Sequence, residues 1–468
     1  MHELLFESAA ALAKLMRSKQ VSPVELLAAQ ISRIEARNPR LNAFVTTAFD
    51  RARKRAEAIE RDLREGKPAG PLAGLPISIK DAIETAGLRT VGGTRLRESC
   101  IPAHDAPVVA RLKKAGAIVM GKTNVPECSL DYRTENPVFG ATHNPWALDR
   151  VPGGSSGGEA AAIAAGLSPA GVGSDLGGSI RVPAHFCGIV GLKPTPGRVP
   201  ATGHFPPITG PFALGTSIGP MARRVEDLGL LLSVIAGPDD SDAASAPLEP
   251  DRPEAASLDG LGVMWHTDNG IAPVTRATRE AVERAARALA GRGLLVAEQR
   301  PAGIEQSFDL WMALLSGPCV RGTLSLYEGK EELCGPLMNA LRGLPAPPSL
   351  RPYFEAWFER DALRASVLRQ MRDYPVILCP VSSIPAFSLN HRGAFDVDGR
   401  EVDYLQAMSY VDTYNVLGFP AAVVPAGKSP EGLPIGVQVV GRPFEERTVL
   451  AVARVLEEAL GGYQRPPD

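Results

Sequence analysis

The chain has 468 residues with 50 basic and 52 acidic side chains, so its formal net charge is −2, and 44% of its residues are hydrophobic. This composition is typical of a folded globular protein, and the absence of a basic surplus argues against binding to nucleic acid or to an anionic membrane. The first residues, MHELLFESAAALAKLMRSKQ, contain early acidic residues and no long apolar run. They indicate a capped helix rather than a signal peptide, and no stretch reaches the length of a membrane span. We therefore expect a cytoplasmic protein.

Six cysteines are scattered along the chain without a CxxC pair. This spacing favours reduced and mostly buried thiols over a disulfide framework or a zinc site. The sequence therefore gives no reason to expect a metal or another cofactor.

Helical and extended patterns alternate along most of the chain. The clearest helix start is at Ser22, which can cap the helix, with Pro23 at the first helical position and Glu25 able to complete a capping box. Apolar periodicity predicts further helices at 51–65, 108–115, 159–166, 225–235, 275–290, 361–371 and 447–460. It predicts strands at 75–80, 117–123, 169–175, 261–266, 376–380, 421–427 and 434–441, the last two as a hairpin.

This alternation favours an α/β protein with a large mixed, mostly parallel twisted β-sheet covered by helices on both faces. We expect a single domain over residues 1–468, with its core at about 70–230. Residues 238–253 read as a surface loop. Residues 301–352 read as irregular, and the variable region at about 300–400 would suit a cap that faces the substrate.

Two serines lie in glycine-rich clusters, GGSSGG at 153–158 and SDLGGSIR at 174–181, on either side of the alanine-rich helix. Glycines beside a serine let the backbone approach a bound group closely and leave N–H groups to point at it. That arrangement suits a nucleophile next to an oxyanion hole. Taken alone, Ser179 is better interpreted as a turn serine, so a catalytic role requires a base elsewhere in the chain.

Three separated motifs occur in the order found in one enzyme family. They are GLPISIKD with Lys80, GGSSGG with Ser155, and SDLGGSIR with Ser179, continued by FCGIVGLKPTPGRVP. The chain resembles the amidase signature family of serine hydrolases over nearly its whole length. The resemblance implies that Ser179 is the nucleophile, Ser155 a bridging serine preceded by a cis peptide bond, and Lys80 the general base.

Other residues around the two serines match the same family pattern. The resemblance implies that backbone N–H groups of the nucleophile loop form the oxyanion hole, namely those of Leu176, Gly177, Gly178 and Ser179. We expect the neighbouring residues to support the loop rather than react, namely Gly154, Ser156, Asp175 and Arg181. His185 is six residues after Ser179 but lies outside the implied triad, and we expect it to be packed in the interior.

The resemblance also implies a mechanism that needs no metal or cofactor. The residues before Lys80 are apolar, so burial would lower the pKa of its amine toward neutrality and allow it to accept a proton. Lys80 would withdraw a proton through Ser155 while Ser179 attacks the carbonyl carbon. Water would then hydrolyse the acyl-enzyme by the same relay.

Two other classes of protein share parts of these motifs. GGSSGG satisfies G-x-S-x-G, so Ser155 could be the nucleophile of an α/β-hydrolase with a distant His266 or His391. The glutaminase subunit of tRNA-dependent amidotransferases also resembles this chain. That subunit usually has Gln after SIR, where Val182 stands here, and a serine-rich segment in place of GHFPPITGPFALGTSIGP. These departures favour a free-standing amidase.

The variable region contains apolar residues that could line a substrate pocket or belong to the core, namely Trp311, Met312, Leu314, Leu315, Leu337, Leu341, Tyr353 and Trp357. We therefore expect aryl or apolar acyl amides as substrates. Ester and carbamate (urethane) hydrolysis are possible by the same acyl-enzyme route. The expected partners are these small molecules alone, for a monomer or homodimer that binds neither nucleic acid nor membrane.

Overall fold

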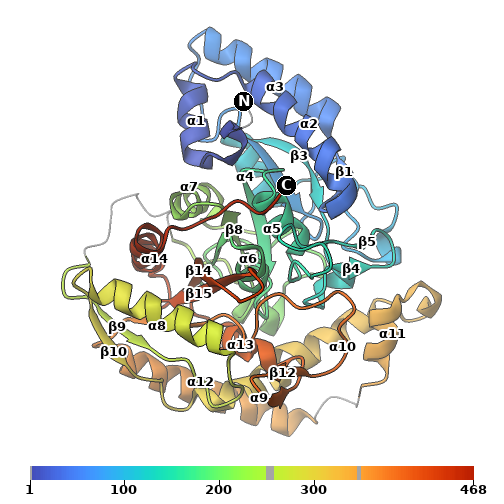
Figure 1. Ribbon diagram of the computed structural model, residues 1–468. Helices are drawn as coiled ribbons and strands as arrows, with labels where there is room; N and C mark the ends of the chain where they lie inside the picture. The colour runs from blue at the N-terminus through green and yellow to red at the C-terminus, as the bar shows by residue number, and fades with distance from the viewer. Residues whose placement is uncertain (1–2, 249–257, 345–348) are drawn as a thin grey trace.

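A computed structural model describes residues 3–248, 258–344 and 349–468. Its centre is an eleven-stranded sheet with the order β1-β3-β2-β6-β8-β7-β14-β15-β11-β9-β10, around which the helices are arranged (Figure 1). The strands of this sheet are β1 (Phe44–Thr47), β2 (Pro76–Lys80), β3 (Ile118–Thr123), β6 (Ala170–Asp175), β7 (Val190–Lys193), β8 (Ser217–Ala222), β9 (Gly262–Trp265), β10 (Leu295–Glu298), β11 (Val376–Pro380), β14 (Ala421–Lys428) and β15 (Pro434–Val440). Two small hairpins pair β4 (Glu135–Asn136) with β5 (Gly140–Ala141) and β12 (Phe395–Val397) with β13 (Arg400–Val402).

The large mixed sheet is confirmed, and its two pairing types are separated in space. Parallel pairs occur on the two wings, between β2 and its neighbours β3 and β6 and between β9 and its neighbours β10 and β11. The middle of the sheet, from β6 through β8, β7, β14 and β15 to β11, is antiparallel. The parallel share is therefore smaller than expected from the sequence. The antiparallel β14–β15 pairing confirms the predicted hairpin.

The helices are α1 (Ala9–Arg17), α2 (Pro23–Leu41), α3 (Phe49–Arg64), α4 (Pro107–Lys114), α5 (Gly157–Ala164), α6 (Arg181–Cys187), α7 (Val225–Ile235), α8 (Arg276–Ala290), α9 (Ser307–Trp311), α10 (Gly317–Ser325), α11 (Pro336–Arg342), α12 (Leu350–Gln370), α13 (Ser409–Val416) and α14 (Glu446–Leu460). The predicted cap is present at α2, where the Ser22 hydroxyl accepts hydrogen bonds from the amides of Val24 and Glu25. None of the helices that the structure describes is long and apolar enough to cross a membrane.

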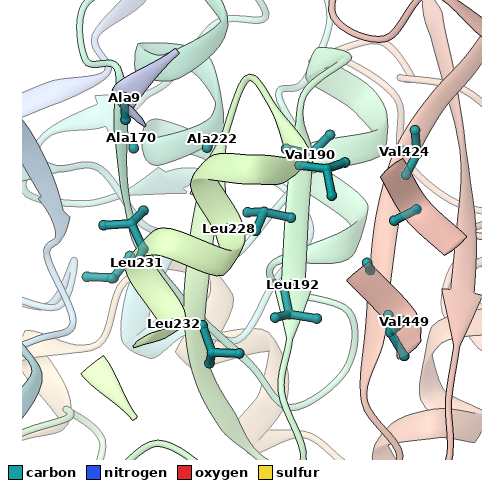
Figure 2. Close-up of a cluster of buried hydrophobic side chains, with 14 of the residues drawn as sticks. Ala9, Ala170, Val190, Leu192, Ala222, Leu228, Leu231, Leu232, Val424 and Val449 are labelled. Atoms are coloured by element: carbon teal, nitrogen blue, oxygen red, sulfur yellow. The ribbon is translucent and has the colours of Figure 1, made fainter. Parts of the chain in front are cut away.

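Helices cover both faces of the sheet, and β14 makes this clear because its side chains alternate between the faces. Val424 packs in the cluster that contains α7, α8 and α14, whereas its neighbour Val423 packs in the cluster that contains α5 and α6. Figure 2 shows the first cluster, in which Leu228 and Leu231 of α7 lie over the central strands. Burial of apolar side chains in two layers, at about 25 cal/mol per Å² of area removed from water, stabilises this three-layer arrangement.

The expectation of an irregular segment at 301–352 is wrong. In the described residues it forms α9, a π-helical turn (Met312–Ser316), α10, α11 and the start of α12. Its prolines mark helix starts, since Pro318 and Pro336 occupy the first turns of α10 and α11, where no backbone N–H is required. The predicted loop at 238–253 is outside helices and strands up to residue 248, and the remainder lies outside the described residues.

Candidate active site

The sheet brings the predicted catalytic residues to one edge. Because β2 and β6 are parallel neighbours, their carboxyl ends meet, and Lys80 is the last residue of β2. The turn that carries Ser179 follows directly after β6, and Ser155 stands just before the N-terminus of α5. Residues that are distant in the chain are thus gathered at one site by two strand ends and one helix start.

The Lys80 side chain is fully buried and makes two hydrogen bonds. Its Nζ lies 2.6 Å from Ser155 Oγ and 2.9 Å from Ser174 Oγ. The Gly154–Ser155 peptide bond is cis, which the family resemblance implied. Lys80 and Ser155 are therefore in direct contact, as a base and a bridging serine must be.

Burial lowers the pKa of the Lys80 amine, so that part of it is neutral and can act as a base. Removal from water lowers the pKa of its amine to about 7, although the nearby carboxyl groups of Asp175 and Glu159 act in the opposite direction. An appreciable fraction of Lys80 is then neutral at pH 7 and carries a lone pair next to Ser155. The presence of neutral Lys80 at pH 7 supports its predicted role as the general base.

The loop that carries the predicted nucleophile (residues 176–179, the nucleophile loop) borders a cavity of about 260 Å³. Ser155, Ser174 and Ser179 are among the residues that line it. The remaining lining residues are Cys128, Ser129, Leu130, Leu176, His204, Pro206, Pro207, Ile208, Thr209, Phe212, Thr216, Cys319, Gly322, Thr323 and Leu326. No aspartate, glutamate, lysine or arginine is among these described lining residues. The cavity is thus a mostly apolar chamber with hydroxyl groups at the predicted reaction centre.

The eight apolar residues considered as pocket candidates do not line this cavity. They pack instead in two interior clusters, one around Trp311, Leu314 and Leu315 and another around α10 and α11. Among the described residues of the region at about 300–400, those that line the cavity are Cys319, Gly322, Thr323 and Leu326, all on or next to α10. A helix presents one face to a cavity and turns its larger apolar side chains toward the core, so composition alone could not separate the two sets.

The structure removes one residue from the predicted oxyanion hole. The N–H of Gly178 donates a hydrogen bond of 2.8 Å to Asp175 Oδ1, so it does not point at a substrate. The N–H groups of Leu176, Gly177 and Ser179 remain as the predicted donors. An aspartate that accepts from the residue three positions later is a common local motif, and Asp175 was the signal for it in the sequence.

Trp311 holds the nucleophile loop from outside the cavity. Its Nε1–H donates to the carbonyl oxygen of Leu176 at 3.0 Å, and Tyr132 donates to the carbonyl oxygen of Gly177 at 2.7 Å. A trans peptide is planar with its N–H opposite its C=O, so the Trp311 bond also orients the N–H of Gly177. The sequence predicts Trp311 only as a pocket or core residue, because no local pattern indicates this contact.

We expect a Trp311→Phe variant to fold and to lose about tenfold in kcat with KM little changed, because one predicted oxyanion donor is less well held. Steady-state kinetics with an amide that the wild-type enzyme hydrolyses would measure the change in kcat and KM. Trp357→Phe is the matched control, since Trp357 packs in the same apolar cluster on α12. Equal losses in both variants would contradict a specific role for the Trp311 hydrogen bond.

Asp175 and Arg181 form a fully buried ion pair beneath the nucleophile loop. Arg181 Nη2 lies 2.9 Å from Asp175 Oδ1, and Asn415 donates to the same oxygen at 2.9 Å. Burial raises the pKa of Asp175, but the charge and hydrogen bonds of Arg181 outweigh it and hold the pKa below its usual range. Arg181 also donates to the carbonyl oxygen of Val411 at 3.0 Å, which ties the loop to α13.

We expect Arg181→Ala to destabilise the protein by about 3–5 kcal/mol, because it removes the cation that is hydrogen-bonded to the buried Asp175 carboxylate. A denaturant titration would measure the free energy of unfolding of both proteins from the midpoint and the slope of the transition. Arg276→Ala removes an exposed, solvent-screened ion pair with Glu280 and should leave the denaturation midpoint close to that of the wild type. A similarly small effect at Arg181 would show that the buried pair does not stabilise the loop.

The remaining predicted residues take structural positions. The Ser156 hydroxyl forms two long hydrogen bonds of 3.4 Å with Ser174, one to its carbonyl oxygen and one from its N–H. Gly154 packs so closely that an added Cβ would clash with the Asp131 carbonyl oxygen. His185 is fully buried, and its Nδ1 accepts from the N–H of Gly436 at 2.7 Å. These contacts agree with the supporting roles expected for Gly154 and Ser156 and with a packed histidine.

The histidines required by an α/β-hydrolase do not meet Ser155. His391 lies on an exposed loop, where its ring stacks on Phe395 with centroids 4.4 Å apart. His266 is buried at the end of β9. The side-chain hydrogen bond that the structure gives Ser155 Oγ is with Lys80. The geometry therefore favours a lysine base over a histidine base.

A family model described as Amidase matches residues 25–450. The chain belongs to the amidase signature family. A bacterial aryl acylamidase of this family has 29% sequence identity and a TM-score of 0.87, with 97% of this chain and 96% of that chain covered. The fold and the general class, an enzyme acting on C–N bonds, are therefore confirmed for this amidase-family chain.

Relatives identified by sequence bear a more specific name. A protein from Carboxydothermus hydrogenoformans that is named as a glutamyl-tRNA(Gln) amidotransferase subunit is 35% identical, with 97% of this chain and 98% of the relative covered. A protein of the same name from Thermus thermophilus is 38% identical over 94% of each chain. The alignments thus span nearly the full length of these relatives.

These relatives contradict two expectations from the sequence. One is the free-standing hydrolase of aryl or apolar acyl amides, esters and carbamates, and the other is the restriction of partners to small molecules without nucleic acid. One departure that favoured them, Val182, is fully buried in the cluster around α5 and α6, so it does not contact the cavity. A residue in the core reports packing rather than substrate choice, and it could not separate the two subfamilies.

Proposed function

We propose that this amidase-family chain is the amide-cleaving subunit of a tRNA-dependent amidotransferase. It would hydrolyse the side-chain carboxamide of glutamine and supply ammonia for amidation of an amino acid attached to tRNA. The observation that carries the proposal is the near full-length similarity to proteins named as glutamyl-tRNA(Gln) amidotransferase subunits. Lys80 contacts Ser155, and Ser155 and Ser179 line the same cavity. This arrangement provides the base, the relay and the nucleophile that amide cleavage requires.

In the proposed reaction, neutral Lys80 takes a proton from Ser155 as Ser155 takes one from Ser179, and Ser179 Oγ attacks the carboxamide carbon. The N–H groups of Leu176, Gly177 and Ser179 would hold the oxyanion. When the C–N bond breaks, the proton returns through Ser155 to the nitrogen, and ammonia leaves. Water then cleaves the ester on Ser179, which releases glutamate and restores the starting enzyme.

Partner subunits would complete the assembly. With a net charge of −2 the chain has no surplus of cations for phosphate contacts, so we expect partners to provide most of the affinity for tRNA. The described cavity lining also has no charged side chain for the amino and carboxylate groups of glutamine. We therefore expect the isolated chain to bind free glutamine weakly, and the assembled complex to bind it well. This function would place the protein in the cytoplasm, with the tRNA.

The test is to purify the tagged chain from its native host with its bound subunits and to measure ammonia released from glutamine. Glutamate-charged tRNA, uncharged tRNA and no tRNA would be compared, and formation of glutaminyl-tRNA would be followed with radiolabelled glutamate. Release that depends on charged tRNA and is lost in Ser179→Ala is the expected result. Absence of any amidation of tRNA by the purified assembly would refute the proposal, whatever the chain hydrolyses alone.

A further inference from the structure

His204 lies next to the predicted base but outside every motif that pointed to the site. It belongs to the segment between β7 and β8 and lines the cavity beside Ser155 and Ser174. Its Nε2 lies 2.8 Å from Ser174 Oγ, which in turn lies 2.9 Å from Lys80 Nζ. A continuous line of hydrogen-bonding groups therefore runs from Ser155 through Lys80 and Ser174 to His204.

The second ring nitrogen of His204 fixes the tautomer. Nδ1 lies 2.7 Å from the carbonyl oxygen of Pro206, which can only accept a hydrogen bond, so Nδ1 carries the proton. Burial, reinforced by the charge of Lys80, lowers the pKa of His204 to about 3, and the ring is neutral at ordinary pH. Nε2 is then an acceptor, and the Ser174 hydroxyl must donate to it.

This arrangement fixes the direction of the next hydrogen bond. A serine hydroxyl has one proton, and because Ser174 gives it to His204, Ser174 can only accept from Lys80. Neutral Lys80 has two N–H bonds and one lone pair. With an N–H directed at Ser174, its lone pair is available to take the proton of Ser155. If Ser174 were free to donate, its hydroxyl would compete with Ser155 for that lone pair.

We propose that His204 is a positioning residue that sets the polarity of the chain Ser155–Lys80–Ser174 and so keeps the Lys80 lone pair for Ser155. The inference rests on the assignment of Lys80 as base in the proposed function. It goes beyond that function by adding two groups to the triad, Ser174, which contacts Lys80, and His204, which acts through the Ser174 hydroxyl.

The charged groups around this chain agree with a neutral His204. Lys80 on β2, Lys122 on β3 and Arg97 all act against its protonation. The anionic groups that act on Lys80 are Asp175, which is paired with Arg181, and Glu159 on α5. Burial raises the pKa of Glu159 itself to about 7, and this residue accepts hydrogen bonds from Ser78 and Thr123. The titration of Lys80 must therefore be followed separately from that of Glu159.

The experiment uses inactivation by phenylmethanesulfonyl fluoride, because sulfonylation of Ser179 with loss of fluoride requires the base but neither glutamine nor partners. We expect His204→Phe to slow inactivation about tenfold at high pH and to move its midpoint to lower pH, since Ser174 can then donate to neutral Lys80 and stabilise it. His204→Gln, whose Oε1 can accept from Ser174, should restore part of the rate. An unchanged midpoint in His204→Phe would overturn the inference.

Two further measurements separate this role from simple packing. In a Ser174→Ala background, His204→Phe should have no additional effect on the inactivation rate, because His204 acts through Ser174. Additive losses would overturn the proposal. Nitrogen NMR of the seven histidines should find His204 protonated at Nδ1 and not at Nε2. The Nε2–H tautomer would overturn it even if one variant failed to fold.

The outcome also distinguishes this inference from the proposed function. Full reactivity of the Lys80→Ala variant would show that Lys80 is not the base, and it would refute the mechanism proposed for glutamine hydrolysis. Loss of reactivity in Lys80→Ala together with a wild-type pH profile in His204→Phe would leave that mechanism intact and refute only the role of His204.

Discussion

Replacing Ser179 with alanine is expected to lower turnover by about 10⁶-fold, because removal of a nucleophile from a serine hydrolase leaves only binding and oxyanion stabilisation. The same variant should take up no sulfonyl group from phenylmethanesulfonyl fluoride, as read by intact mass. Ser179 lines the cavity beside Ser155, so a second hydroxyl is close to the reaction centre. The Ser155 hydroxyl, however, is hydrogen-bonded to Lys80, which favours a role for Ser155 as the proton relay.

Two comparisons make this test decisive. Ser155→Ala should be severe but less complete, since Ser179 would keep its hydroxyl and lose only its path to Lys80. Ser18→Ala, on the exposed C-terminal cap of α1, is the control and should retain full activity. If Ser179→Ala still formed a covalent sulfonyl adduct at Ser155, the assignment of the two serines would be reversed.

Lys80→Ala is expected to reduce turnover by about 10²- to 10⁴-fold, the range typical for loss of a general base. In the wild type, the reactive form has neutral Lys80, and burial places its pKa at about 7. The rate should therefore fall about tenfold for each pH unit below 7 and level off above it. Both glutamine hydrolysis and sulfonylation should follow this profile between about pH 5 and 9.

The controls for Lys80 address its charge and its neighbours. Lys80→Arg keeps a cation but removes a base that can become neutral, so it should be as inactive as the alanine variant. Lys428→Ala, on the exposed end of β14, should behave as the wild type. A flat rate across neutral pH in the wild type would exclude a titrating lysine as the base.

Local sequence determined much of the scaffold of the site. The apolar run before Lys80 predicted β2, and the glycine clusters predicted the turns that hold Ser155 and Ser179. These features follow from alternation, capping and glycine content, which act over a few residues. The ordered motifs also indicated the family, which the comparisons confirm. Of the two departures that favoured a free-standing amidase, Val182 lies in the core and carries no information on the substrate, whereas the segment at 203–220 lines the cavity.

Tertiary structure decided which neighbours each of these groups has. Trp311 reaches the nucleophile loop from α9, and His204 reaches Ser174 from the segment before β8. Both contacts join residues that are 30 to 135 positions apart, and no pattern in the chain marks them. A hydrogen bond is set by distance and direction after the sheet and helices have packed, whereas propensity and periodicity act only along the chain. The sequence by itself therefore determined which groups are candidates for the reaction, and the packed fold decided how they are oriented and what lines the cavity.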